Sequence, residues 1–343
     1  MVELLPLPLV IAANLFVGKP WAASATTLVA GSAVAAVGFF GVVDILGVQV
    51  LAQDLSPQTR FALDAGQIVT AAAAAGFLIP PIRRDFAMVA PIDPDNPVHT
   101  LALVLAALLL GTQITSIAFT DVLTADLHQA PLSLADLALD EGPFLVLALA
   151  GVGLFIRRNA AGAAGRLGLV RPAWWHIVVA LAAAGVFLAL GQASDVLSHT
   201  LSPDLARRVD ATTNHVFGQL GSPIGIVAVA LIPGICEEVL FRGALQPRLG
   251  LIATAVLFTS VHTEYGLSFD TLAVFVLALG LGLVRKYTNT TSSCLCHVSY
   301  NLLVGISLAG AMLNVAIVAE AMLIAVAAYA IWTERRRRAS VTD

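Results

Sequence analysis

Residues 223–242 read PIGIVAVALIPGICEEVLFR, an uncharged apolar run that ends in two glutamates and an arginine. About 20 consecutive apolar residues are enough for a helix to cross the hydrocarbon core of a bilayer. The stretch therefore predicts a membrane helix that carries Glu237, Glu238 and Arg242 below the membrane surface.

The composition of the whole chain agrees with a membrane protein. Of its 343 residues, 58% are hydrophobic and 12% are charged, whereas an ordinary soluble domain has about 25% charged residues. This excludes a soluble globular protein and makes the lipid bilayer the first partner. The formal net charge of -4 offers no basic face for a nucleic-acid backbone, so nucleic acid is excluded as a partner.

Apolar runs alternate with charged or proline-rich breaks along the chain. We predict an all-α fold, a polytopic transmembrane helical bundle with about 9–11 spans, because one or two of the shorter runs are expected to be re-entrant or merged. The runs are 4–18, 22–52, 61–82, 98–120, 142–156, 176–196, 223–241, 250–265, 269–284, 289–308 and 311–332.

The distribution of basic residues predicts the orientation. If the Arg335–Arg338 tail is inside, alternation of the runs places 15 of the 18 lysines and arginines on the same side, as the positive-inside rule requires. We therefore expect a cytoplasmic C-terminus. Together with the high alanine content, the charge bias favours the cell membrane of a prokaryote.

The polar breaks divide the chain into four parts. Residues 1–197 form N-terminal transmembrane helices of unassigned role, and 198–222 form an extracytoplasmic connection. Residues 223–308 form the expected catalytic helical core, and 309–343 form a final helix and a basic cytoplasmic tail. The acidic segment 121–141 fits a solvated loop and an interfacial amphipathic helix equally well.

Helical spacing sorts the three charged residues of the 223–241 run. Glu238 and Arg242 are four apart and share a helix face, where they can form an ion pair, whereas Glu237 is turned about 100° away from Glu238. Pro233 and Gly234 lie just upstream, where a kink would aim Glu237 into a cavity.

Three further polar residues lie in later apolar runs, namely His262, His297 and Asn301. At about 1.5 Å per residue from the predicted cytoplasmic ends, Glu237 lies about 8 Å deep, His297 about 13 Å and His262 about 18 Å. One site in the cytoplasmic half of the bilayer can therefore contain all three. A carboxylate can take a proton from water while imidazoles hold that water or a divalent metal such as zinc, with His262 and His297 as ligands, and Asn301 can donate to an oxyanion.

These residues resemble the motifs of the CPBP family, the CAAX protease and bacteriocin-processing intramembrane endopeptidases that include type II CAAX prenyl endopeptidases and the Abi proteins. The family motifs E-E-x-x-x-R, F-x-x-x-H and H-x-x-x-N appear here in the same order. They begin at Glu237, Phe258 and His297.

The resemblance implies a peptidase of glutamic or metal-dependent type. It assigns Glu237 as the general base, acting with His262 on the nucleophilic water, and it assigns oxyanion stabilisation to His297 and Asn301. Glu238 and Arg242 are supporting residues by the same resemblance. The implied reaction is hydrolysis of a peptide bond in a membrane-associated or lipid-anchored protein or leader peptide.

Two other functions use the same residues. A proton- or ion-coupled transporter would route its ion through the Glu and His cluster, but the first six runs carry few of the charges that such a path needs. A catalytically silent family member would act as a scaffold or immunity protein. The intact set of Glu237, His262, His297 and Asn301 favours the endopeptidase.

Overall fold

The computed structural model describes residues 4–47, 55–308 and 310–342. The end of the predicted run 22–52 (residues 48–52) lies outside this part, as do residues 309 and 343 of the predicted C-terminal part. The chain is 82% helical and the described residues contain no strand. The predicted all-α fold is therefore confirmed.

The helices follow one another with short connections. The longer ones are α1 (Leu7–Phe16), α2 (Ala22–Ile45), α3 (Pro57–Gly76), α5 (Pro97–Phe119), α7 (Leu134–Gly151), α9 (Trp174–Leu201), α10 (Pro203–Phe217), α11 (Pro223–Glu237), α13 (Leu251–Ser260), α14 (Phe269–Tyr287), α15 (Thr290–Ile306) and α16 (Gly310–Thr342). The shorter ones are α4 (Pro80–Phe86), α6 (Val122–Leu127), α8 (Ala160–Leu167), η2 (Gly218–Leu220), η3 (Glu238–Leu245), α12 (Gln246–Leu249) and η4 (Thr263–Tyr265).

Each predicted apolar run contains a helix, but the helices differ in their capacity to cross a membrane. In the described residues, five are long and apolar enough to do so: α2, α5, α9, the continuous stretch Pro223–Leu249, and α16. A sixth span results if α3 and α4, which are bent by 82° at their junction, count as one. This number is below the predicted 9–11 because helices such as α13, with 10 residues, reach only about 15 Å.

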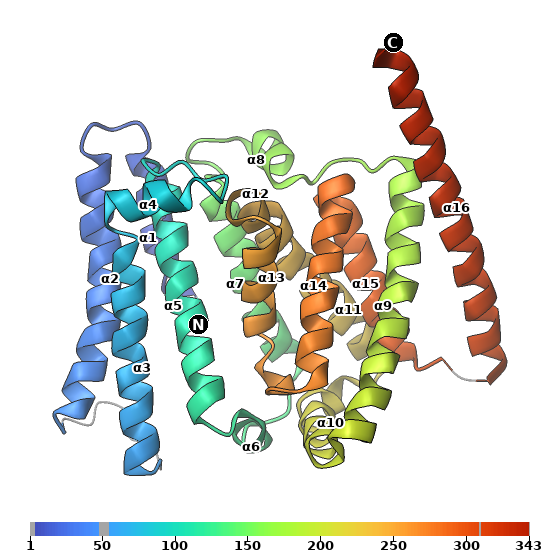
Figure 1. Cartoon of the computed structure of the whole chain (residues 1–343), viewed down its shortest axis with the longest axis horizontal. Helices are drawn as coiled ribbons and strands as arrows, with labels where there is room; N and C mark the ends of the chain where they lie inside the picture. The colour runs from blue at the N-terminus through green and yellow to red at the C-terminus, as the bar shows by residue number, and fades with distance from the viewer. Residues whose placement is uncertain (1–3, 48–54, 309, 343) are drawn as a thin grey trace.

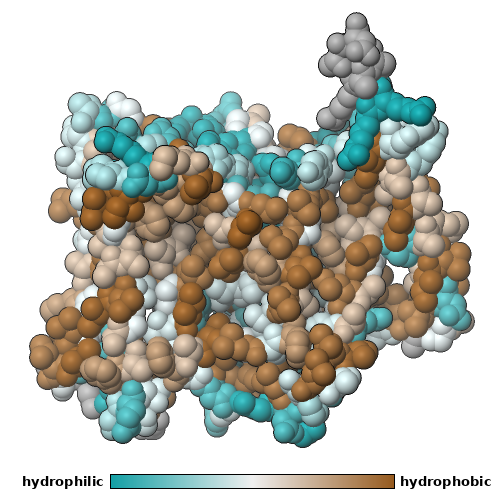
Figure 2. Space-filling model, viewed as in Figure 1, coloured by the Kyte–Doolittle hydropathy of each residue, from teal (hydrophilic) through white to brown (hydrophobic). Residues whose placement is uncertain are grey.

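The helices lie side by side between two polar ends (Figure 1). At one end, here called the basic end, lie α4, α8, α12 and the last turns of α16, which contribute Arg83, Arg84, Arg166, Arg248 and Arg335–Arg337. Helices α6 and α10 lie at the opposite end. Figure 2 shows a hydrophobic band between two hydrophilic ends, the pattern that a bilayer imposes on a multi-pass protein.

The segments between apolar runs are more helical than their polarity suggests. Most of the predicted connection 198–222 is helical, since α9 extends to Leu201 and α10 fills residues 203–217. The acidic segment 121–141 forms α6, a loop and the beginning of α7. Asp121 begins α6 and pairs with Arg208 of α10, and hydrogen bonds from Thr124 and Arg208 hold the pKa of Asp121 below its usual value.

One close helix contact positions the part of the chain from α11 onward. Gly234 of α11 packs against Val298 of α15, so a Cβ atom at Gly234 would lie 2.8 Å from Val298 Cγ2 and 3.1 Å from its backbone nitrogen. Only glycine permits this approach. The contact brings the end of α11, with Glu237, against the α15 turn that carries His297.

We predict that Gly234→Ala destabilises the protein by about 1–3 kcal/mol, the usual cost of overpacking a close contact. The measurement is thermal unfolding of the purified protein in detergent. Gly142→Ala in α7 is the matched control, because a Cβ at Gly142 has no neighbour within 4 Å. Equal melting temperatures for the two variants would contradict the close contact.

Candidate active site

The two adjacent glutamates lie where a helix changes its geometry. Helix α11 ends at Glu237 and continues without a break into η3, a π-helical segment. The sequence predicts an opening at Pro233 and Gly234, but α11 runs through both residues and the backbone widens after Glu237 instead. π-Helical turns inside longer helices are often found at functional sites.

Glu238 is fully buried, and both of its carboxylate oxygens have partners. Oε1 lies 3.2 Å from His297 Nδ1, and Oε2 accepts a hydrogen bond from Ser293 Oγ. Oε2 also lies 3.6 Å from Arg242 Nε, which is the ion pair expected from the spacing of four residues. These contacts connect η3 to two successive turns of α15.

Arg242 is fully buried as well, at 0% exposure. Its guanidinium carbon lies 4.4 Å from the centre of the Phe258 ring, and its Nη2 donates to the carbonyl of Ala278 at 3.3 Å. A cation over an aromatic face is attracted by the ring quadrupole. Arg242 therefore connects η3 to α13 and α14 while it balances the charge of Glu238.

Glu237 faces away from this pair and toward the two histidines. Its Oε1 lies 3.8 Å from His262 Nε2, and its Oε2 lies 3.9 Å from His297 Nδ1. Both distances are too long for a direct hydrogen bond. Glu237 Oε2 is buried and has no hydrogen-bond partner among the described residues, so it is free to accept a proton or a hydrogen bond from a ligand.

His262 lies just after the end of α13, not inside a helix as the predicted run 250–265 implies. Its Nδ1 lies 2.8 Å from the carbonyl oxygen of Phe258. Because a carbonyl only accepts, Nδ1 carries a proton, and when the ring is neutral it presents an unprotonated Nε2 toward Glu237. An ionised Glu237 and this nitrogen are then two acceptors that face each other.

Two acceptors at this distance require a donor between them. A water molecule has two O–H groups, and one can be donated to Glu237 Oε1 while the other is donated to His262 Nε2. The same geometry also accommodates a proton held by Glu237. In either case the pair is arranged to hold and move a proton.

His297 and Asn301 lie one turn apart on α15 but contact different partners. Since a carboxylate only accepts, His297 Nδ1–H donates to Glu238 and leaves Nε2 for another contact. Asn301 Nδ2 donates to the carbonyl of Val229 at 3.3 Å. The structure thus brings His297 to Glu237, whereas one N–H of Asn301 is used to join α15 to α11.

Ser293 and the main chain of Ala278 are site components that sequence reasoning missed. Ser293 lies four residues before His297 and therefore on the same face of α15, a signal that was present in the spacing. The carbonyl of Ala278 had no signal, because every residue carries one. Only the packing of α14 against η3 selects it.

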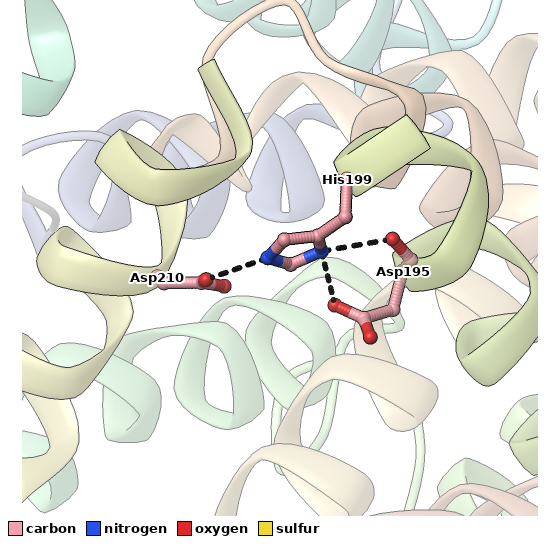
Figure 3. A group of neighbouring side chains, drawn as sticks. All are labelled: Asp195, His199 and Asp210. Atoms are coloured by element: carbon pink, nitrogen blue, oxygen red, sulfur yellow. Dashed lines mark hydrogen bonds and ion pairs between the residues drawn. The ribbon is translucent and has the colours of Figure 1, made fainter. Parts of the chain in front are cut away.

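A second group of polar side chains lies near the opposite end of the bundle (Figure 3). His199 of α9 approaches Asp210 of α10 through Nε2 at 3.1 Å. Its Nδ1 lies 3.0 Å from the Asp195 carbonyl and 3.2 Å from the Asp195 carboxylate. All three residues are exposed, and the carboxylates approach different ring nitrogens. The arrangement suits an ion pair that ties α10 to α9.

The exposed group at Asp195, His199 and Asp210 and the buried cluster around Glu237 differ in how close their possible metal-ligating atoms lie. Among the described residues, the ligand atoms of Asp195, His199 and Asp210 lie within 4.8 Å of one another. The atoms of Glu237, His262 and His297 do not form such a group in the described structure.

We predict that Arg242→Ala lowers the free energy of unfolding by about 3–5 kcal/mol, because Glu238 would remain as a buried charge without its cation. The measurement is thermal or denaturant unfolding in detergent. The double variant Glu238→Gln/Arg242→Met should recover part of the loss, since it removes both charges. If Arg242→Ala unfolds like the unmodified protein, the pair has no supporting role.

Comparison with known proteins adds one finding to this geometry. Residues 219–303, about a quarter of the chain, match the family described as type II CAAX prenyl endopeptidase Rce1-like. The match contains all six residues of the predicted site. No curated protein and no solved structure matches the chain. Residues 219–303 are thus similar to the Rce1-like family, which confirms the predicted resemblance to the CAAX protease family in a chain with five or six helices that could cross a membrane.

Proposed function

We propose that this protein is an intramembrane endopeptidase in which Glu237 activates the water that attacks a peptide bond. The observation that carries the proposal is the pair of facing acceptors, Glu237 Oε1 and His262 Nε2, 3.8 Å apart. The similarity of residues 219–303 to the Rce1-like family supports a CAAX-type endopeptidase at the level of the family. The role of each residue rests on the geometry.

In this mechanism the attacking water donates one hydrogen bond to Glu237 and one to His262. Glu237 takes the proton as the water oxygen attacks the carbonyl carbon, and it returns that proton to the leaving nitrogen. Glu237 is screened from bulk solvent, since it is 5% exposed, whereas the His262 side chain is 19% exposed. The interactions of Glu237 with the reacting atoms are correspondingly strong.

His297 and Asn301 are proposed to stabilise the oxyanion. Glu238 fixes the orientation of the His297 ring by accepting from Nδ1, which leaves Nε2 for the substrate. Asn301 uses one N–H on Val229 and retains a second. Glu238 and Arg242 act as positioning residues, since their own polar atoms are directed to each other and to α14 and α15.

The proposed substrate is a membrane-associated or lipid-anchored protein or leader peptide. A family of CAAX proteases implies a membrane-associated protein or peptide substrate. The site lies inside the bundle: His297 is seven residues from the start of α15, which corresponds to about 10 Å from the basic end. A segment held at the membrane surface can enter from that side.

We predict that Glu237→Gln abolishes cleavage, by about 100-fold or more for loss of a general base, while the protein still folds. Membrane fractions from cells with either form are compared by proteomics for protein termini that require the unmodified protein. Glu320→Gln is the matched control, since Glu320 is a carboxylate of α16 that packs against Gly185 of α9. It should leave those termini unchanged.

Three results would contradict the mechanism. Normal cleavage by Glu237→Gln would exclude Glu237 as the base. Loss of cleavage from purified protein after treatment with a metal chelator, with recovery on adding zinc, would replace the glutamic mechanism by a metal-dependent one. Unchanged termini together with a loss of proton or ion flux in Glu237→Gln vesicles would favour a transporter.

We also propose that the basic end faces the cytoplasm, because cytoplasmic segments retain lysine and arginine. A fluorescent protein fused after residue 343 should then fluoresce in bacterial cells, and alkaline phosphatase fused there should be inactive. An active phosphatase fusion would place the basic end outside. A prokaryotic cell membrane remains the proposed location.

A further inference from the structure

A cavity of about 260 Å³ lies at the basic end, away from Glu237. It lies between α12, the start of α13 and the end of α14. Its lining residues are Gln246, Pro247, Gly250, Leu251, Arg285 and Lys286. Two of these six residues are cationic and none is acidic, so the cavity is suited to an anion.

Neither cation is neutralised by a carboxylate in the described part of the chain. Arg285 is half-buried, and its Nε donates to the carbonyl of Arg242 at 3.0 Å. Its two terminal nitrogens have no hydrogen bond among the described residues. The Lys286 ammonium lies 5.6 Å from the Tyr287 ring centre. Five N–H groups, two on Arg285 Nη1, two on Nη2 and one of the three on Lys286, are enough to surround a phosphate oxygen pair.

The start of α13 adds backbone donors to the same cavity. Gly250 begins the helix at φ +83°, and no side chain caps it. The N–H groups of the first turn have no partner within the helix, and they carry the positive end of its dipole. Since Gly250 and Leu251 line the cavity, this helix end is directed to the ligand that Arg285 and Lys286 would hold.

Gln246 forms part of the wall of the cavity and joins α12 to α14. Its side chain is only 8% exposed, and its Nε2 donates to the carbonyl of Gly282 at 2.8 Å. The polar contacts available to a ligand therefore come from Arg285, Lys286 and the start of α13.

The surroundings of the cavity indicate an amphiphilic ligand. Ile252 of α13 is 68% exposed and Leu283 of α14 is 40% exposed, on helices whose surface belongs to the hydrophobic band of the bundle (Figure 2). On the side of the cavity that faces the basic end, the neighbouring charged side chains are positive. Burial lowers the pKa of Arg166 to about 10, and the nearby charge of Arg248 adds to this effect.

We propose that this cavity binds the headgroup of an anionic phospholipid. Arg285, Lys286 and the N–H groups at the start of α13 hold the phosphodiester. The acyl chains lie along the exposed apolar faces of α13 and α14. This site is separate from the catalytic cluster and does not depend on the proposed peptidase activity.

The test is lipid binding to the full-length protein in detergent, measured by native mass spectrometry as a dissociation constant. Phosphatidylglycerol should bind more tightly than phosphatidylcholine with the same acyl chains. Each Lys or Arg near an anionic headgroup contributes about fivefold in affinity, so Lys286→Gln should weaken phosphatidylglycerol binding about fivefold. Arg285→Gln/Lys286→Gln should weaken it about 30-fold.

Arg84→Gln is the charge-matched control, since Arg84 is an exposed arginine of α4 at the same end. It should keep the affinity of the unmodified protein.

Specific results would overturn the proposal. Equal affinity for phosphatidylglycerol and phosphatidylcholine would exclude an anion site. If Lys286→Gln and Arg84→Gln lost the same affinity for phosphatidylglycerol, the binding would come from the general surface charge and not from this cavity. Displacement of the lipid by glycerol 3-phosphate at a concentration similar to that of the lipid would make the ligand a soluble phosphate.

Discussion

The rest of the site depends on one constraint, the burial of Arg242 and Glu238 inside a membrane bundle. Charges at this depth are retained only when they are paired and hydrogen-bonded. Here the compensation comes from three other elements: α13 supplies the Phe258 ring, α14 the Ala278 carbonyl, and α15 both Ser293 and His297. The interactions that stabilise the charge pair therefore also set the relative positions of the helices that carry the candidate catalytic groups.

The adjacent glutamates differ because of their direction, not their chemistry. Successive helical residues are turned by about 100°, so Glu238 enters the charge pair while Glu237 faces His262 and His297. All the oxygens of Glu238 have partners, whereas Glu237 Oε2 has none among the described residues. The Glu238 carboxylate therefore stabilises the packing of the helices, whereas the Glu237 carboxylate has an oxygen available to a ligand. The proposed division between positioning and base catalysis follows from this difference.

The proposed headgroup cavity is linked to the site through the π-helical η3. Arg285 at the cavity donates to the backbone carbonyl of Arg242, and Gln246 directly follows η3. A bound headgroup would hold Arg285 in place next to the segment that carries the buried pair. The basic end would then both orient the protein in the membrane and stabilise η3 locally.

The sequence by itself determined the fold class and the identity of the main polar residues, because apolar run length and the helical period act within one segment. It correctly predicted the Glu238–Arg242 pair, since four-residue spacing alone sets that contact. Only the tertiary structure decided that His297 donates to Glu238, that Asn301 donates to Val229, and that Ser293 joins the network. It also showed that five or six helices of the described chain, compared with the predicted 9–11, are long and apolar enough to cross a membrane. These features depend on how separate helices pack, and contacts between helices follow from side-chain shapes such as the close approach at Gly234, which no local pattern encodes.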